Sequence, residues 1–481
     1  MRRIVLLRVL AMLLGIVGLS MIPALVIALA EGDQTSVTSF MYPIVLSVVV
    51  ALVAFVFGKQ VPMRFSPRDG FLLVSAAWAL TAFFGAAPFV ISGYIPNLAD
   101  AVFESVSGFT TTGASILKDV EALPRSLLFW RSMTHWLGGM GIVVLTVALL
   151  PLLGVGGFQL LKAETPGPDK DRVAPKITAT AKILWLIYIG LTAVQVVLLM
   201  IGGMDWFDAT THAFGTMATG GFSTKNASVG YFRSPWIDGV TTVFMVLAGM
   251  NFSLYYRLLK GKFSDFVSNS ELRAYLAIFF MASLLIALSI RPIYGNFLTA
   301  FRFASFQAAS ILTTTGFATT DFDLWLPFAK SVLLVLMFIG GCSGSTGGGI
   351  KVVRLVVAFK QAANEMRRFL FPRGVFSIRL NGKVGRKDVV YGVAGFIFLY
   401  MLIVLAVTVV VASSGTDLTS SLTGALATVG NIGPGFGVVG PVANYSGFPD
   451  YVKWVFSFAM IAGRLELWTV MILFMPEFWR R

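Results

Sequence analysis

Charged residues are scarce in this chain, because Asp, Glu, Lys and Arg make up 12% of its 481 residues, about half the share of an ordinary soluble domain. The single cysteine, Cys342, excludes an internal disulfide framework. The two histidines, His135 and His212, are too few and too far apart in sequence to indicate a metal site, so we expect them to pack in helices. The chain also lacks the clustered acids, histidine set or Ser/Lys pair that a membrane enzyme needs. No catalytic residue is therefore predicted.

Long apolar runs follow one another from end to end, and 57% of the residues are hydrophobic. Each run has about the length, roughly 20 residues, that a helix needs to cross a bilayer. The runs are continuous and do not alternate, which favours helices over a membrane barrel. The sequence predicts an all-α integral membrane protein with spans near residues 4–30, 40–58, 70–93, 126–153, 181–203, 235–257, 272–290, 328–358, 389–413 and 452–475.

The first apolar run has some features of a signal peptide. Arg2 and Arg3 precede it, and Ala28-Leu29-Ala30 resembles a cleavage site. The run is about twice as long as the apolar region of a signal peptide, however. We therefore interpret it as a retained helix.

The basic residues indicate a topology. Of the 37 Lys and Arg residues, 27 fall at the two ends of the chain and in alternate loops near 59–69, 159–182, 257–273 and 351–387, and 9 fall on the opposite side. By the positive-inside rule, both termini lie in the cytoplasm. The basic residues separate apolar runs and form no surface patch, so no nucleic-acid partner is expected. The largest cluster comprises Lys351, Arg354, Lys360, Arg367, Arg368, Arg373, Arg379, Lys383, Arg386 and Lys387.

Four semi-polar stretches on the opposite side repeat one another at intervals of about 100 residues. In the first three, a Thr precedes a Gly by two positions and a polar residue precedes the same Gly by nine. The matching segments are Thr111-Thr112-Gly113, Thr219-Gly220-Gly221 and Thr314-Thr315-Gly316. In the fourth stretch the same spacing selects Thr428-Val429-Gly430, but Gly433 is a second candidate.

Four Thr-x-Gly loops in equivalent places are typical of an ion filter. Irregular backbone at membrane depth is tolerated where it lines a watery cavity, and a ring of backbone carbonyls can replace the hydration shell of a cation. Glycine permits the required backbone angles, and the negative C-terminal ends of short helices favour a cation nearby. A single such cluster is more often a surface turn, but four aligned copies favour the filter.

The span near 328–358 is interrupted by a run of small residues, Gly340 to Gly349, which cannot remain helical comfortably. No phosphate-binding spacing is present around Lys351. We interpret the run as a mobile flap in a pore, and the alternative is a close helix-packing seam.

Arg464 lies in the middle of an apolar span. A central arginine costs about 2.5–3.5 kcal/mol on insertion scales, so it should face water or a partner. Glu466 is on another helical face, so we expect the loop carbonyls or pore water as partners and a barrier to resting ion flow. The alternative is a structural pair with an acid on another helix.

The chain resembles the membrane subunit of the bacterial Trk potassium-uptake system, the TrkH/TrkG type, within the superfamily that includes KtrB and plant HKT transporters. The resemblance covers essentially the whole chain. It is carried by the repeats and by His135-Trp-Leu-Gly-Gly-Met-Gly-Ile, Gly341-Cys-Ser-Gly-Ser-Thr-Gly-Gly-Gly-Ile-Lys351 and Gly463-Arg-Leu-Glu466.

The resemblance implies two extra N-terminal helices and four helix–pore loop–helix repeats around a pseudo-fourfold pore. It points to Asn431-Ile432-Gly433 as the fourth filter strand, with Val429 and Gly430 as the alternative. It also implies a gate, formed here by Arg464 and the residues Gly344, Ser345, Thr346, Gly347, Gly348 and Gly349.

The expected cargo is K⁺, with Rb⁺ or Cs⁺ as surrogates, and no organic cofactor is expected in this chain. The resemblance implies a homodimer with one pore per protomer in the lipid of the bacterial inner membrane. It further implies a cytosolic partner of the TrkA type, a ring of nucleotide-binding RCK domains. The basic segment 351–387 is a candidate docking surface for that ring, although its charge also fits a role in topology alone.

The expected organisation is two N-terminal helices in 1–69 and four pore repeats in 70–175, 176–270, 271–385 and 386–481. A secondary symporter for K⁺ or Na⁺ is the alternative function. It would predict inverted halves with broken helices at corresponding positions, whereas the sequence indicates four like-oriented repeats and one conspicuously broken span.

Overall fold

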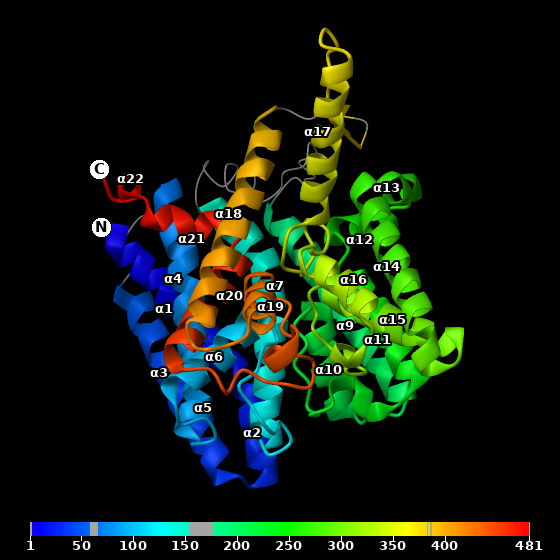
Figure 1. The fold of residues 1–481 in the computed structure, drawn as a ribbon. Helices are drawn as coiled ribbons and strands as arrows, with labels where there is room; N and C mark the ends of the chain where they lie inside the picture. The colour runs from blue at the N-terminus through cyan, green and yellow to red at the C-terminus, as the bar shows by residue number, and fades with distance from the viewer. Residues whose placement is uncertain (1, 58–65, 153–176, 382, 385–386, 481) are drawn as a thin grey trace.

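The computed structural model describes residues 2–57, 66–152, 177–381, 383–384 and 387–480 (Figure 1). Regular structure in these ranges is almost entirely helical, apart from the short paired strands β1 (Arg379–Leu380) and β2 (Lys383–Val384). The all-α class is therefore confirmed. Some features expected from the sequence lie outside the described residues. They are most of the basic loops near 59–69 and 159–182, the repeat boundary at 175, and Arg386.

The N-terminal region forms a helical hairpin at one side of the molecule (Figure 1). Helices α1 (Arg2–Ser20) and α2 (Ile22–Glu31) together contain one apolar span, Leu6–Glu31, and α3 (Gln34–Phe57) returns antiparallel to it. Gly18 packs against Ser47 so closely that a Cβ there would collide with its side chain. Small residues allow this close approach, as is usual between membrane helices.

Four repeats follow, and each contains a long helix, a short half-helix and a further helix. The long helices are α4 (Pro67–Gly85, continued by α5, Ala87–Ile91), α9 (Ile177–Ile201), α14 (Ser270–Tyr294) and α18 (Lys387–Ala412). The half-helices are α6 (Leu98–Phe109), α10 (Trp206–Ala218), α15 (Phe297–Leu312) and α19 (Leu418–Val429). The expected architecture of two N-terminal helices and four pore repeats is confirmed.

The last helix differs more from repeat to repeat than the long helix and the half-helix do. In repeat one it is α7 (Arg125–Leu152), and in repeat two it is divided into α11 (Pro235–Ala248) and α12 (Phe252–Leu259), followed by α13 (Phe263–Ser268). In repeat three it is divided into α16 (Pro327–Met337) and α17 (Val352–Leu370). In repeat four α20 (Asp450–Arg464) is followed by α21 (Trp468–Met471) and α22 (Pro476–Trp479). Short 3-10 turns, η1 (Ser228–Phe232), η2 (Phe322–Leu324), η3 (Gly437–Val439) and η4 (Ile472–Phe474), complete the order.

Every half-helix begins at an Asn or Asp whose side chain accepts a backbone N–H of the first turn, a capping arrangement that stabilises a helix start. The four caps are Asn97, Asp205, Asn296 and Asp417. Asn97, Asp205 and Asp417 each lie sixteen residues before the glycine of their repeat, which is Gly113, Gly221 and Gly433 respectively. The half-helices are buried along most of their length, so irregular backbone at their ends is enclosed by protein.

The expectation of a single broken span is wrong. Six helices in the described part of the chain are long and apolar enough to cross a membrane, and two bent pairs raise this to eight. The predicted spans 235–257 and 452–475 are these pairs, with bends of 94° and 112°. The first bend occurs where Asn251 caps a new helix. The second follows Arg464, where Glu466 and Leu467 have φ of 61° and 51°.

Candidate ion pathway

Each half-helix ends in a three-residue segment with the same unusual backbone. We call these the Thr/Gly segments and number them by repeat: Thr111–Gly113, Thr219–Gly221, Thr314–Gly316 and Asn431–Gly433. Their first residues have φ of 53°, 57°, 60° and 54°, and their glycines have φ of 80°, 81°, 83° and 98°. Left-handed Thr is uncommon and clusters at functional sites. The shared pattern makes the four segments structurally equivalent.

Gly430 does not share this backbone. It has φ of −80° at the C-cap of α19, and Val429 is the last helical residue. Asn431 and Gly433 instead have the two left-handed values. The equivalent position in repeat four is therefore occupied by Asn431–Gly433.

The four segments close into a ring. Each glycine approaches the carbonyl oxygen of the residue before the next glycine so closely that a Cβ would collide with it. The pairs are Gly113 with Gly220, Gly221 with Thr315, Gly316 with Ile432, and Gly433 with Thr112. For the last pair the Cβ would lie 2.6 Å from the oxygen. Since the fourth segment returns to the first, all four surround one axis.

A cavity of about 150 Å³ lies at this ring, and all four glycines line it. Residues that follow the segments, such as Ser115, Ser223 and Ala318, complete the wall. A polar mouth with convergent backbone groups is suited to receive a small ion.

Polar side chains of the half-helices form hydrogen bonds with the residues that follow each segment. Glu104 accepts from Ser115 Oγ at 2.9 Å, His212 Nε2 lies 2.8 Å from Ser223 Oγ, and Gln307 Nε2 donates to Thr319 Oγ1 at 3.4 Å. These are the three polar residues nine positions before the glycine. In repeat four, Thr423 Oγ1 accepts from Phe436 N at 3.0 Å.

The first residues of the segments supply buried side-chain oxygens. Thr111 Oγ1 and Asn431 Oδ1 are buried and have no hydrogen-bond partner among the described residues. A buried oxygen without a partner is costly, so such atoms indicate a function or an ion. The Asn431 amide nitrogen, by contrast, donates to Thr112 Oγ1 and Met460 O, both at 2.9 Å.

The glycine-rich loop, Gly340–Gly349, packs against the C-terminal ends of the half-helices of repeats two and four and against the Thr/Gly segment of repeat three. Gly348 N donates to Thr314 Oγ1 at 2.7 Å, and Thr346 Oγ1 donates to Met217 O at 3.0 Å. A Cβ on Gly348 would collide with Gly430 O. The loop closes on itself through Gly340 N and Ile350 O at 2.9 Å. Its glycines therefore permit contact that larger residues would prevent.

Arg464 joins this loop to the first repeat. Its side chain is 3% exposed, and it donates to Thr346 O at 2.7 Å and to Gly138 O at 3.0 Å. The expected loop-carbonyl partner is thus observed. Among the ion pairs of the described residues none joins Arg464 to a carboxylate. Glu466 instead pairs with Arg354 of α17.

Two further residues of this site escaped the sequence analysis. The buried Glu271 carboxylate accepts from Ser343 N at 2.6 Å and from Val353 N at 3.1 Å, so one side chain binds both the loop and the start of α17, which follows it. Lys351 is 7% exposed and donates to Gly347 O. In the sequence Glu271 looks like an ordinary acid in the first turn of a helix, and no signal separated it from other acids. Lys351 ends the loop motif that carries the family resemblance, but it was interpreted only as part of the basic cluster.

The family model described as "TrkH: Cation transport protein" matches residues 37–481. The chain belongs to the TrkH family. TrkH-family relatives include the Trk system potassium uptake protein TrkH of Escherichia coli strain K12, which is 42% identical over 419 residues and 86% of each chain. The protein of the same name from Halomonas elongata is 39% identical over 99% of each chain.

A solved TrkH structure has the same fold. The crystal structure of the potassium transporter TrkH from Vibrio parahaemolyticus matches with a TM-score of 0.87 and 36% identity over all of both chains. The TrkH family is one of cation transport proteins and not of enzymes. The chain is a multi-pass membrane protein of this transporter family.

Proposed function

We propose that the chain carries K⁺ into the cell across the cytoplasmic membrane, through a filter formed by the four Thr/Gly segments. The observation that carries the proposal is the closed ring of four equivalent segments with left-handed glycines. The relatives of similar length are named for potassium uptake, which supports K⁺ as the cargo. Rb⁺ and Cs⁺ serve as surrogates, and the chain needs no organic cofactor.

The chemistry is replacement of hydration water. A K⁺ ion that enters the cavity exchanges its waters for backbone carbonyl oxygens of the ring. The buried oxygens of Thr111 and Asn431, which have no hydrogen-bond partner among the described residues, add two side-chain oxygen ligands. Four half-helices end at the segments, and their partially negative C-terminal ends stabilise the cation.

We test this proposal by measuring ⁸⁶Rb⁺ uptake into liposomes that contain the purified chain, with K⁺ or Na⁺ as competitor. Gly113→Ser, Gly221→Ser and Gly316→Ser place a Cβ against a carbonyl of the ring, so we expect each to weaken the preference for K⁺ over Na⁺. Gly190→Ser is the matched control, because no atom lies within 4 Å of a Cβ there. An unchanged preference in all three ring variants would remove the filter assignment.

The gate of the proposed pathway is the glycine-rich loop together with Arg464. The loop contacts the inner side of the ring through Gly348 and Thr314, and the Arg464 guanidinium adds a positive charge next to it. A positive charge at low dielectric repels a cation strongly. The arrangement therefore fits a closed state that opens when the loop moves.

A conduit is favoured over a secondary symporter by the pattern of broken helices. The breaks occur in the last helix of repeats two, three and four, and not at matching positions of two inverted halves. Uptake measured with and without a proton or sodium gradient distinguishes the two functions.

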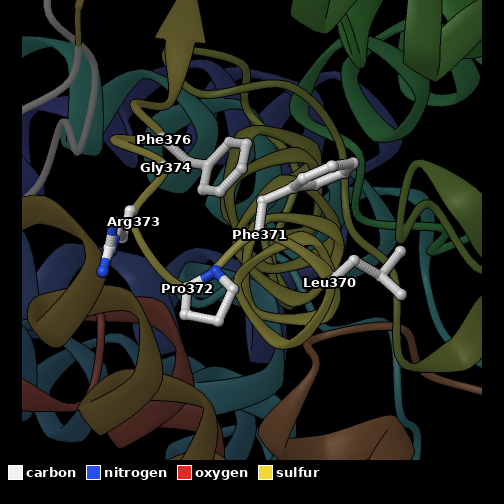
Figure 2. A pocket seen from close by; sticks show the side chains of 6 residues that line it. All are labelled: Leu370, Phe371, Pro372, Arg373, Gly374 and Phe376. Carbon is white, nitrogen blue, oxygen red and sulfur yellow. The ribbon is translucent and has the colours of Figure 1, made fainter.

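Regulation by a cytosolic ring of nucleotide-binding RCK domains, and assembly as a homodimer, complete the proposal. Helix α17 projects beyond the other helices (Figure 1). The turn after it carries Phe371, Arg373 and Phe376 around a shallow pocket (Figure 2), and Phe369 is 87% exposed. Aromatic and arginine side chains are enriched at protein interfaces. Their exposure here supports docking of the cytosolic RCK-domain ring at this end of the molecule.

The proposed location is the bacterial inner membrane with both termini in the cytoplasm. Figure 1 shows the two chain ends at the same end of the molecule as the projecting α17. The basic residues of α17, including Arg367 and Arg368, lie at that end, which supports this orientation.

A further inference from the structure

Two polar side chains one turn apart on α7, Arg131 and His135, are buried at 3% and 0% exposure. Residues four apart lie on the same helix face. Both side chains contact Phe222, which directly follows the glycine of segment two. Helix α7 belongs to repeat one, so this contact crosses between repeats.

His135 connects the half-helix of repeat one to the backbone of Phe222. Its Nδ1 lies 2.7 Å from Gly108 O, and its Nε2 accepts from Phe222 N at 3.1 Å. A carbonyl can only accept and a backbone N–H can only donate. The imidazole is therefore neutral with its proton on Nδ1. The ring also stacks on Phe222, with 4.0 Å between centroids.

Arg131 holds the next residue. Its Nη1 donates to Ser223 O at 2.9 Å, while its Nε donates to Glu104 Oε1 at 2.6 Å. The guanidinium carbon lies 3.5 Å from the Phe222 ring centroid. Phe222 and Ser223 are thus fixed through their backbone as well as through the aromatic ring. We call Arg131, His135 and Phe222 the filter brace.

Repeat three has a related arrangement, and the other two repeats differ. Phe317 follows the glycine of segment three and stacks on His212 of repeat two, with 5.7 Å between centroids. The corresponding residues in repeats one and four are Ala114 and Pro434, which offer no aromatic ring. Aromatic rings stacked on a histidine therefore follow segments two and three, whereas in segment four the Tyr445 hydroxyl donates to Gly433 O at 2.8 Å.

We propose that Arg131 and His135 are positioning residues that set the ion preference of segment two by fixing Phe222. The inference rests on the proposed function. The carbonyl of Gly220 lies against Gly113, and Gly220 also packs directly on the His135 imidazole. A shift of Phe222 and this imidazole therefore changes the size of the ring of segments. The residues of the filter brace are outside the four segments and the gate.

The decisive experiment compares His135→Gln with His135→Asn in the ⁸⁶Rb⁺ competition assay, with uptake normalised to folded protein. A Gln amide oxygen reaches the position of Nε2 and can accept from Phe222 N, whereas Asn reaches only the position of Nδ1. We expect His135→Asn to reduce the preference for K⁺ over Na⁺ about fivefold, as loss of one buried hydrogen bond implies. We expect His135→Gln to retain most of it. The control is Thr408→Val, which removes a buried hydroxyl in α18.

Phe222→Leu provides a second route, since it removes the aromatic ring and keeps the backbone. A reduced preference in Phe222→Leu supports the proposal even where His135→Asn does not fold. An unchanged preference in Phe222→Leu and in the histidine variants overturns it, whatever the total uptake. If Gly221→Ser still alters the preference in that case, only the filter brace is refuted. If Gly113→Ser, Gly221→Ser and Gly316→Ser also leave the preference unchanged, the filter assignment itself is refuted.

Discussion

Among single residues, the first positions of the four segments combine one shared backbone conformation with two kinds of side chain. Three are threonines and the fourth is Asn431, yet all four have the same left-handed backbone. The Asn431 amide nitrogen is used internally, and its Oδ1 is left without a partner, as is Thr111 Oγ1. On the proposed function, these two oxygens are further ligands for the ion.

Thr111→Val tests this directly, because it removes the hydroxyl and keeps the shape. The loss of one oxygen ligand, worth about 1 kcal/mol, should raise the KM for ⁸⁶Rb⁺ about fivefold. The thermal unfolding temperature should change little, since Thr111 Oγ1 has no protein partner among the described residues. An unchanged KM would contradict a role for this hydroxyl in ion binding.

At the scale of elements, side chains from other helices hold the glycine-rich loop in place. Glu271 of α14 accepts from Ser343 N within the loop and from Val353 N in the first turn of α17. Arg464 of α20 binds the middle of the loop through Thr346 O. The loop is thus held from two separate helices, and either attachment can be removed by substitution.

Arg464→Ala and Glu271→Gln should both increase resting ⁸⁶Rb⁺ flux in the absence of any regulatory partner. The first removes the positive charge, and the second weakens the charge-assisted hydrogen bonds that hold the loop. The preference for K⁺ over Na⁺ should persist, because the four segments are unchanged. Glu365→Gln, an exposed carboxylate of α17, is the matched control. Unchanged flux in Arg464→Ala would exclude the barrier role.

The sequence predicted elements best where the same residues recur. Thr and Gly at fixed spacing identified three segments, because positive φ and close approach restrict the residues allowed. The shared Asn and Asp caps, sixteen residues before three of the glycines, would have identified the fourth as well. The bend after Arg464 was missed, because Leu465-Glu466-Leu467 contains no Gly or Pro. The role of Glu271 depends on tertiary contacts that no local pattern reveals.

For the whole molecule, orientation in the membrane is the property most open to test. Val375, after α17, is 98% exposed, and Leu324, after segment three, is 80% exposed. The two residues should lie on opposite sides of the membrane, since α16 and the glycine-rich loop separate them. The native Cys342 is buried, so its background reaction with a thiol reagent should be small.

Single cysteines at these positions should therefore react differently with a membrane-impermeant maleimide. Leu324→Cys should be labelled in intact cells, and Val375→Cys only after the cells are permeabilised. The unsubstituted chain measures the background. Labelling of Val375→Cys in intact cells would reverse the proposed orientation.

The glycine-rich loop belongs to a single repeat, although the ring it contacts is built from all four. A channel assembled from four identical subunits has four equivalent gating elements, which can move one after another and give partly open levels. On the proposed function, one displacement of this loop opens the whole passage. Single-molecule current records of one protomer should accordingly switch between two levels, without intermediate steps.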